Sequence, residues 1–303
     1  MGTGKHTRRS HTVPRVYLQG FADDKNQMLC RRKGQANTFR ISISDASVRK
    51  DFYSLPGHPN SPDEFEKTLG RFEQYYPKWL SLIEQSKPIT NGDRLNLAGY
   101  LAFQVLRGVR FYDAVSVSEK ENVLMLFASL SSKDLQAWFR SQDYALTTEE
   151  VETIRLEVLS GYREVEVGSR AFVQHVDREV QAIQGHLVAR KWQFLRYDEH
   201  TLITSDQPIS LLTGSNSRST EIYETLMELN IEISMPLSRN IGLKIMPPSS
   251  EDLIEIGMGI HDVFRQGTVE EADVLNQTVS RQAEEAIFAH PDDSALLASL
   301  DIP

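Results

Sequence analysis

Hydrophobic residues recur at helical spacing along most of the first two thirds of the chain. In the segment 61–85, for example, Phe65, Leu69, Phe72 and Tyr76 fall on one face of a helix. Residues 93–113 are apolar nearly all round, which is typical of a central, buried helix. The same reasoning predicts further helices over residues 14–21, 118–130, 133–142, 147–187 and 268–290.

Residues with capping preferences mark several of these predicted helix ends. Ser61 as the N-cap, Pro62 in the first turn and Glu64 as the reciprocal partner predict a capping box. The segment Thr268–Glu271 predicts another one at the start of the last helix. Pro77 predicts a kink or a new helix start, because proline lacks a backbone N–H.

Alternating polar and apolar residues, rich in β-branched and aromatic types, predict strands. They pair most simply as three hairpins, formed by residues 28–33 with 38–44, 191–197 with 201–205, and 231–237 with 241–247. We therefore expect an α+β fold, with a predominantly helical body and a small antiparallel β element. That element comes from the N-terminal hairpin and from strands in residues 190–247.

The 303 residues show no internal repeat and no low-complexity tract. We predict a flexible basic N-terminus over residues 1–10, a single α+β domain over residues 11–290, and a loose C-terminal tail over residues 291–303. Hydrophobic residues make up 40% of the chain and charged residues 25%, the balance of a soluble globular protein.

The net charge of −9 is unevenly distributed. Residues 1–50 hold 11 Lys and Arg against 3 Asp and Glu, a net charge of +8, whereas residues 51–303 hold 22 against 39, a net charge of −17. The basic segment either docks on the acidic body or attracts phosphate. An acidic protein binds nucleic acid poorly overall, so such a contact is expected only at a local basic cleft.

Several classes of protein are excluded or disfavoured. Cys30 is the single cysteine, so no internal disulfide is possible, and no Cys/His cluster has zinc-site spacing. The longest apolar run, residues 122–130, is too short to span a bilayer, and no apolar segment follows Lys5, Arg8 and Arg9 as in a signal peptide. We therefore expect a cytoplasmic protein without a membrane partner. Gly-rich phosphate loops, GxSxG and HExxH motifs are absent from the sequence.

Candidate chemistry starts with Asp206, which follows a predicted strand and precedes the rigid Pro208. A carboxylate at a strand end is well placed for catalysis or metal binding, and equally for closing a turn by binding backbone N–H groups. Gln104 and Arg107 share one face of the apolar helix. A buried guanidinium needs a partner, which is either a structural carboxylate or an anionic substrate.

Glu66 and Glu73 lie two turns apart on one face of the capped helix. They either ligate a divalent cation, hold Arg107, or belong to a solvated acidic face. His11 precedes the first helix and titrates near neutrality, so it is either a proton carrier or a surface residue. Asn276 points inward from the last helix, as a ligand contact or as part of a core network.

These residues also follow one another in a familiar order: His11-x-x-Pro14-x-x-Tyr17-Leu18-x-x-Phe21, Asp51-Phe52-Tyr53, Glu66, Glu73, Gln104-x-x-Arg107, Trp192, Thr204-Ser205-Asp206-x-Pro208, Pro236-Leu237-Ser238 and Asn276. The succession resembles the bacterial family catalogued as domain of unknown function 4238, over roughly residues 11–290. Gln207 departs from that family's pattern, which more often has asparagine there. The resemblance implies no agreed reaction, but the candidate residues coincide with the family's pattern.

Two hypotheses for function follow. The first is an enzyme acting on a phosphate-containing substrate or nucleic acid, most simply a metal-dependent nuclease or phosphodiesterase, with a toxin or phage-defence effector as its context. In it Glu66, Glu73 and Asp206 hold Mg²⁺ or Mn²⁺; His11, Tyr17, Arg107 and Asp206 are catalytic; and Arg15, Tyr53, Gln104, Ser205 and Asn276 bind the substrate. The second is a non-catalytic module that binds a ligand or a protein, in which the same polar residues form a structural network.

Overall fold

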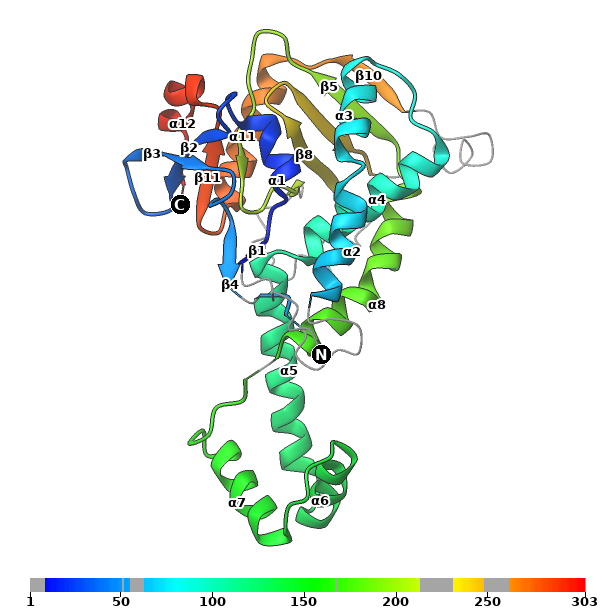
Figure 1. Cartoon of the computed structure of the whole chain (residues 1–303), viewed down its shortest axis with the longest axis vertical. Helices are drawn as coiled ribbons and strands as arrows, with labels where there is room; N and C mark the ends of the chain where they lie inside the picture. Colours follow the sequence, from blue (N-terminus) through cyan, green and yellow to red (C-terminus); the bar gives the residue numbers. More distant parts are fainter. Residues whose placement is uncertain are drawn as a thin grey trace, which may run out of the picture.

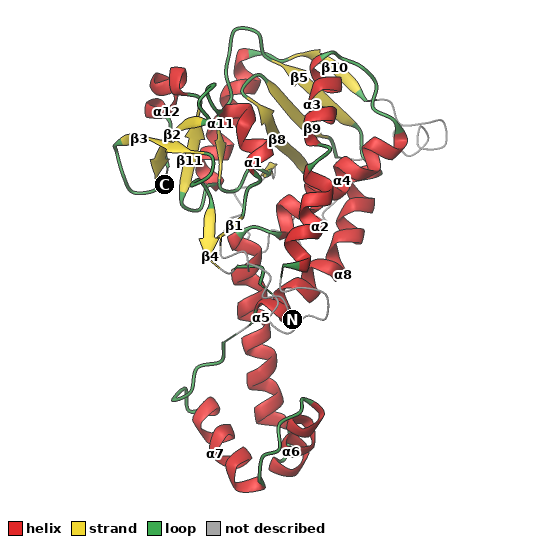
Figure 2. Ribbon diagram, viewed as in Figure 1, coloured by secondary structure: helices red, strands yellow, loops and turns green. Residues whose placement is uncertain are grey.

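A computed structural model of the chain describes residues 9–50, 52–54, 63–166, 168–212, 231–247 and 262–302. These residues form helices together with antiparallel and mixed sheets, so the predicted α+β class is confirmed (Figure 1 and Figure 2). The helices are α1 (Arg15–Leu18), α2 (Glu64–Glu73), α3 (Tyr76–Glu84), α4 (Asn91–Leu106), α5 (Val109–Ser129), α6 (Ser132–Ser141), α7 (Thr148–Leu159), α8 (Ser169–Val188), α11 (Val269–Gln282) and α12 (Ser294–Ser299), with short 3-10 helices η1 (Gln19–Phe21) and η2 (Pro291–Asp293). The strands are β1 (Arg9–His11), β2 (Gln27–Arg32), β3 (Thr38–Ser42), β4 (Val48–Lys50), β5 (Trp192–Arg196), β6 (Thr204–Ser205), β7 (Ser210–Leu212), β8 (Glu232–Ser238), β9 (Ile241–Ile245), β10 (Val263–Gln266) and β11 (Ala286–Ala289).

A five-stranded sheet in the order β10-β5-β9-β8-β7 forms the larger β layer. Its strands are antiparallel except for β10, which runs parallel to β5. One face is apolar and packs on α4 and α8, where Leu101 and Leu187 meet Met235. The opposite face carries polar residues and lies under α11, where Lys244 forms an ion pair with Glu271 at 3.3 Å. Helices therefore cover both faces of this sheet (Figure 2).

A four-stranded antiparallel sheet in the order β3-β2-β11-β6 forms the second β layer. The predicted N-terminal hairpin is confirmed as β2 and β3, and the hairpin of residues 231–247 is confirmed as β8 and β9. The β part is larger than the predicted element, because β1, β4, β7, β10 and β11 lie outside the hairpin strands that we expected. β1 pairs with β4 in a separate two-stranded ribbon.

Two strand predictions are wrong. Residues 191–197 and 201–205 do not form a hairpin, since β5 joins the five-stranded sheet and β6 joins the four-stranded sheet. Residues 286–289 were expected in the last helix but form β11, because α11 ends at Gln282 and the backbone is extended from Ala283 onward. Apolar runs this short fit a strand and a buried helix equally well, so the sequence pattern alone does not separate them.

The apolar segment 93–113 is two helices rather than one. α4 ends at Leu106, and α5 begins at Val109 after an extended Gly108 (φ −72°, ψ 158°). A Cβ atom at position 108 would lie 2.4 Å from the side-chain nitrogen of Gln207, so Gln207 packs directly on this glycine. The residues after Thr147 likewise form two helices, α7 and α8, instead of one long helix.

Local capping signals are more accurate than these helix lengths. Thr147 and Thr268 both form capping boxes, with Glu150 and Glu271 as reciprocal partners. Pro77 lies in the first turn of α3, which starts anew just after α2 as expected. The predicted cap at residues 61–62 lies outside the described residues, and α2 begins at Glu64 without a side-chain hydrogen bond at its N-cap.

One main hydrophobic core extends from Val13 to Leu300 and includes residues of both sheets. A second, small core lies apart from it and consists of Phe127, Leu135, Val151 and Val158. We refer to residues 109–166 as the arm. Figure 1 shows that α5 leads away from the sheets and that α6 and α7 lie at its far end.

Both ends of the described chain are more ordered than we predicted. Of the predicted flexible segment 1–10, residues 1–8 lie outside the described residues, whereas Arg9 and Ser10 belong to β1. The predicted loose tail is wrong for residues 291–302, because they form η2 and α12 and bury Leu297 and Leu300 in the main core. Apolar residues at helical spacing after Pro291 are the signal that we had overlooked.

We therefore expect Leu297→Ala to lower the free energy of unfolding by about 2–5 kcal/mol, because the Leu297 side chain is fully buried. Urea denaturation at constant pH measures the effect. Leu296→Ala is the matched control, since Leu296 is only half-buried and should cost less. Equal losses for the two variants would contradict the packing of α12.

Candidate functional site

Arg107 follows the last residue of α4 and is almost fully buried, with 1% of its surface exposed. Its Nη1 donates to Glu73 Oε1 at 2.6 Å, its Nη2 donates to the backbone carbonyl of His11, and its own carbonyl accepts the Tyr53 hydroxyl at 2.6 Å. Burial opposes the positive charge, but Tyr53 and Glu73 outweigh it and raise the pKa of Arg107. The partner of the buried guanidinium is thus a structural carboxylate, one of the two alternatives left by the sequence.

Several buried polar atoms near Arg107 have no hydrogen-bond partner in the described part of the chain: Glu66 Oε1, Tyr100 Oη, both amide atoms of Gln104, and Gln207 Nε2. The charge of Arg107 acts on the carboxyl group of Glu66 and on the hydroxyl of Tyr100, and Gln207 packs on the adjoining Gly108. Buried polar atoms are normally paired. Their concentration here indicates a place that ordered water or a polar ligand can complete.

Glu66 lies on the buried side of β1. Its side chain hydrogen-bonds Ser10, and burial raises its pKa, with Glu73 adding to the rise while Ser10 and Arg107 oppose it. Neighbouring residues of a strand point to opposite faces. The buried Ser10 therefore faces Glu66, and the side chain of His11 lies on the other side of β1.

The imidazole of His11 is half-buried, and its Nδ1 lies 3.3 Å from the carbonyl oxygen of Ala46. A carbonyl only accepts, so this contact places the proton on Nδ1 and leaves Nε2 with a lone pair. Burial lowers the pKa of His11, the hydrogen bond to Ala46 opposes this, and the charges of Arg15, Arg107 and Arg9 lower it further. His11 is therefore a neutral imidazole of defined tautomer in a positive environment.

Asp206 is 7% exposed and closes a turn, as the alternative reading of its position predicted. Its two carboxylate oxygens accept the backbone N–H groups of Glu284 and Glu285 at 3.0 and 2.7 Å. Burial raises its pKa to about 6, the two backbone hydrogen bonds oppose this, and the charges of Glu285 and Glu284 add to the rise. The carboxylate fixes the entry into β11.

The predicted metal site of Glu66, Glu73 and Asp206 is not assembled in the structure. Glu66 bonds Ser10, Glu73 pairs with Arg107, and Asp206 binds backbone N–H groups on another turn. In the described ranges, no group of three or more His, Cys, Asp or Glu residues is arranged to hold a metal ion. Glu66 and Glu73 lie on the same face of α2, but this shared position does not determine which partner each carboxylate binds.

The remaining predicted site residues bind mainly to backbone. Tyr17 donates to the carbonyl of Pro236 at 2.7 Å, and its hydroxyl lies 2.7 Å from Thr204 Oγ1. Asn276 accepts from the N–H of Ile203 at 2.9 Å and donates to the carbonyl of Thr201 at 3.0 Å. Ser205 bonds the backbone of Gln207 at both its N–H and its carbonyl. Only Arg15 is exposed, and within the described residues it forms no ion pair.

The sequence interpretation missed Ser10, Gly108 and the role of Gln207. Ser10 carried no signal beyond its place next to His11. Gly108 directly follows Arg107 and could have been recognised as a point of close approach, because a glycine in an apolar helical pattern often marks one.

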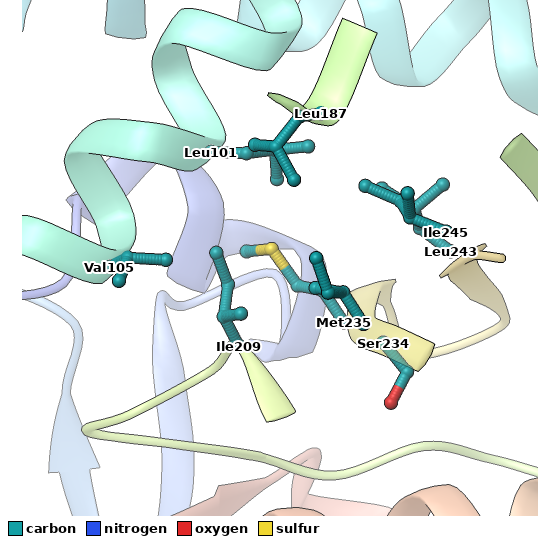
Figure 3. A pocket seen from close by; sticks show the side chains of 9 residues that line it. Leu101, Val105, Leu187, Ile209, Ser234, Met235, Leu243 and Ile245 are labelled. Carbon is teal, nitrogen blue, oxygen red and sulfur yellow. The ribbon is translucent and has the colours of Figure 1, made fainter. Parts of the chain in front are cut away.

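A small apolar cavity of about 10 Å³ lies between α4, α8 and the five-stranded sheet. Leu101, Leu187, Met235 and Ile245 help to line it, and Figure 3 shows the hydroxyl of Ser234 pointing away from them. This space holds at most one water molecule and offers nothing to a charged substrate. It is a packing defect of the core rather than a site.

The fold and the buried Arg107 group define an α+β protein whose sequence motifs are tied together by side chain–backbone hydrogen bonds. The model of a protein family of unknown function, DUF4238, matches residues 9–293, and the chain belongs to this family. Searches of curated proteins and of solved structures give no match. Among the described helices, none is both long enough and apolar enough to cross a bilayer.

The raised pKa of Asp206 predicts a pH dependence of stability. A carboxyl group that binds its proton more tightly in the folded state stabilises the fold at low pH, and this contribution is lost as pH rises through the folded pKa. We expect the contribution of Asp206 to fall by about 3 kcal/mol between pH 4 and pH 6, and Asp206→Asn to lack this slope. Urea denaturation at several pH values measures it, with Asp45→Asn, an exposed site, as a control for charge. Parallel profiles for parent and Asp206→Asn would contradict the assignment.

Proposed function

We propose that the chain is an enzyme that acts on a phosphate-containing substrate, as a nuclease or phosphodiesterase does, and that the reacting phosphate binds next to His11. The observation that carries the proposal is the environment of the His11 imidazole, which is half-buried: burial lowers its pKa, and the nearby charges of Arg15, Arg107 and Arg9 lower it further. A neutral imidazole among guanidinium groups combines a proton acceptor with cations that suit phosphate.

Each of these residues has a distinct part in the proposal. His11 Nε2 accepts the proton of the attacking water or hydroxyl group. Arg15, which is exposed, contacts the phosphate directly, while the buried Arg107 adds positive potential from below. Arg9 is paired with Asp45 at 2.6 Å and adds a further positive charge near His11 without contacting the phosphate.

A metal-dependent form of the proposal uses a different part of the structure. Glu66 and Glu73, on one face of α2, would then be the carboxylate ligands of Mg²⁺ or Mn²⁺. A nucleic acid is one substrate of the right class, bound at the local positive surface around His11. A cytoplasmic location and a role as a toxin or phage-defence effector belong to the same proposal.

A second candidate function is a non-catalytic binding module. It is favoured by the direction of the motif side chains, since Tyr17, Arg107, Asp206 and Asn276 all bind backbone groups inside the protein. In that case the polar residues fix the packing, and the ligand or protein binds elsewhere on the surface.

The two functions are separated by phosphodiester hydrolysis, measured on bis(p-nitrophenyl) phosphate and on fluorescent single-stranded RNA and DNA, with EDTA or Mn²⁺. We expect His11→Gln to lower kcat/KM by about 10²-fold or more, and Arg15→Ala by about 10-fold. Because the pKa of His11 lies below 6.5, the acid limb of the kcat/KM profile should lie below that pH.

Two residues outside the positive surface serve as controls. Arg40→Ala removes an exposed arginine that is paired with Asp23, and His200→Gln removes a half-buried histidine in the turn after β5. Both should keep the parent's activity. Activity that is equal in the parent and in His11→Gln, or absent from the parent on all three substrates, would falsify the enzyme proposal.

A further inference from the structure

The far end of the arm exposes large hydrophobic side chains. On α7 and the turn after it, Leu156, Leu159 and Tyr162 are 60%, 43% and 85% exposed. We call these three residues the α7 patch. They follow one another at intervals of three residues, so they fall near one another along the same side of the helix end.

The α7 patch is not needed to fold the arm. Val151, Ile154 and Val158 form the opposite face of α7 and already pack in the small core of the arm. A helix that is apolar on two faces is normally covered on both. Within the described residues nothing covers its second face, which is typical of an interaction surface.

The surroundings of the patch are acidic. Residues 148–166 hold six glutamates and two arginines, a net charge of −4. Glu149 and Glu152 lie seven and four residues before Leu156, so they share its helix face. Glu149 is exposed, whereas Glu152 is half-buried and accepts from the hydroxyl of Ser132, so the exposed face of α7 begins with the carboxylate of Glu149 and ends with apolar side chains.

We propose that the α7 patch is a docking surface for a basic amphipathic helix of a partner protein. The apolar face of such a helix covers Leu156, Leu159 and Tyr162, and its Lys or Arg residues meet the glutamates. A second copy of the chain fits less well, because a two-fold interface would place the same −4 segment against itself. Charge complementarity thus selects a basic occupant.

The α7 patch lies apart from the reaction site proposed at His11, so a partner docked on it does not block that site. Figure 1 shows α7 at the far end of α5, whereas β1, the strand that contains His11, lies beside the opposite end of that helix. The inference is therefore independent of the reaction proposed at His11, and the two can fail separately.

The experiment uses the full chain and two fluorescein-labelled synthetic peptides with the same leucine pattern, one with lysine and one with glutamate at the polar positions. Fluorescence anisotropy measures binding. We expect the lysine peptide to bind, the glutamate peptide not to bind, and the affinity of the lysine peptide to fall with added salt. Leu156→Ser together with Leu159→Ser should weaken binding about 10-fold or more.

Val269→Ser together with Val274→Ser is the matched control, since these two residues are 44% and 47% exposed on α11. It should leave binding unchanged. The proposal is overturned if the parent does not bind the lysine peptide, if it binds both peptides equally, or if only the α11 variant loses binding. A parent dimer in light scattering that the α7 variant separates also overturns it, in favour of a second copy.

Discussion

The buried guanidinium of Arg107 must find its hydrogen-bond acceptors and its counter-charge within the protein, and this requirement holds several segments in place. A charge with 1% exposure is stable only when its hydrogen bonds and its counter-charge are supplied from within the protein, and removing a partner from such a group typically costs about 3–5 kcal/mol. Here the counter-charge comes from Glu73 on α2, and an acceptor comes from the backbone of His11 on β1. Three segments far apart in sequence must therefore be in place together, which makes their assembly cooperative.

Hydrogen bonds between a buried side chain and the backbone of a distant segment also occur where the two sheets meet. Tyr17 ties the first helix to the backbone of β8, Asn276 ties α11 to the residues before β6, and Asp206 ties the end of β6 to the start of β11. Asn276 and Asp206 satisfy backbone groups in irregular segments that have no ladder partner, and Tyr17 binds a carbonyl next to the irregularity in β8. Buried backbone groups need such partners, so these residues set the relative position of the sheets rather than merely filling space.

The sequence determines the local elements well because their causes are local. Three of them depend only on neighbours within a few residues: the capping box at Thr268, the start of helix α3 at Pro77, and the alternation of polar and apolar residues in β2 and β3. The pairing of β5 with β9 and β10, and of β6 with β11, depends on contacts more than 35 residues apart, which no periodicity encodes. The candidate site could not be predicted for the same reason. Glu66 and Glu73 occupy equivalent positions in the sequence pattern, yet the ion pair with Arg107 is formed by Glu73. The side of β1 on which His11 lies depends on the register of β1 with β4.

Most motif side chains point into the protein, which limits the surfaces on which a functional site can lie. Residues whose polar atoms already bind backbone cannot bind a substrate without loosening the fold, so chemistry must use groups that the fold leaves open. Two such places are the half-buried His11 of β1 with the exposed Arg15 of α1, and the α7 patch of the arm. One is positive and polar, the other acidic and apolar, so they suit ligands of opposite character. In the two proposals, the phosphate group at His11 and the basic partner on the arm therefore bind without competition, because neither ligand uses the surface of the other.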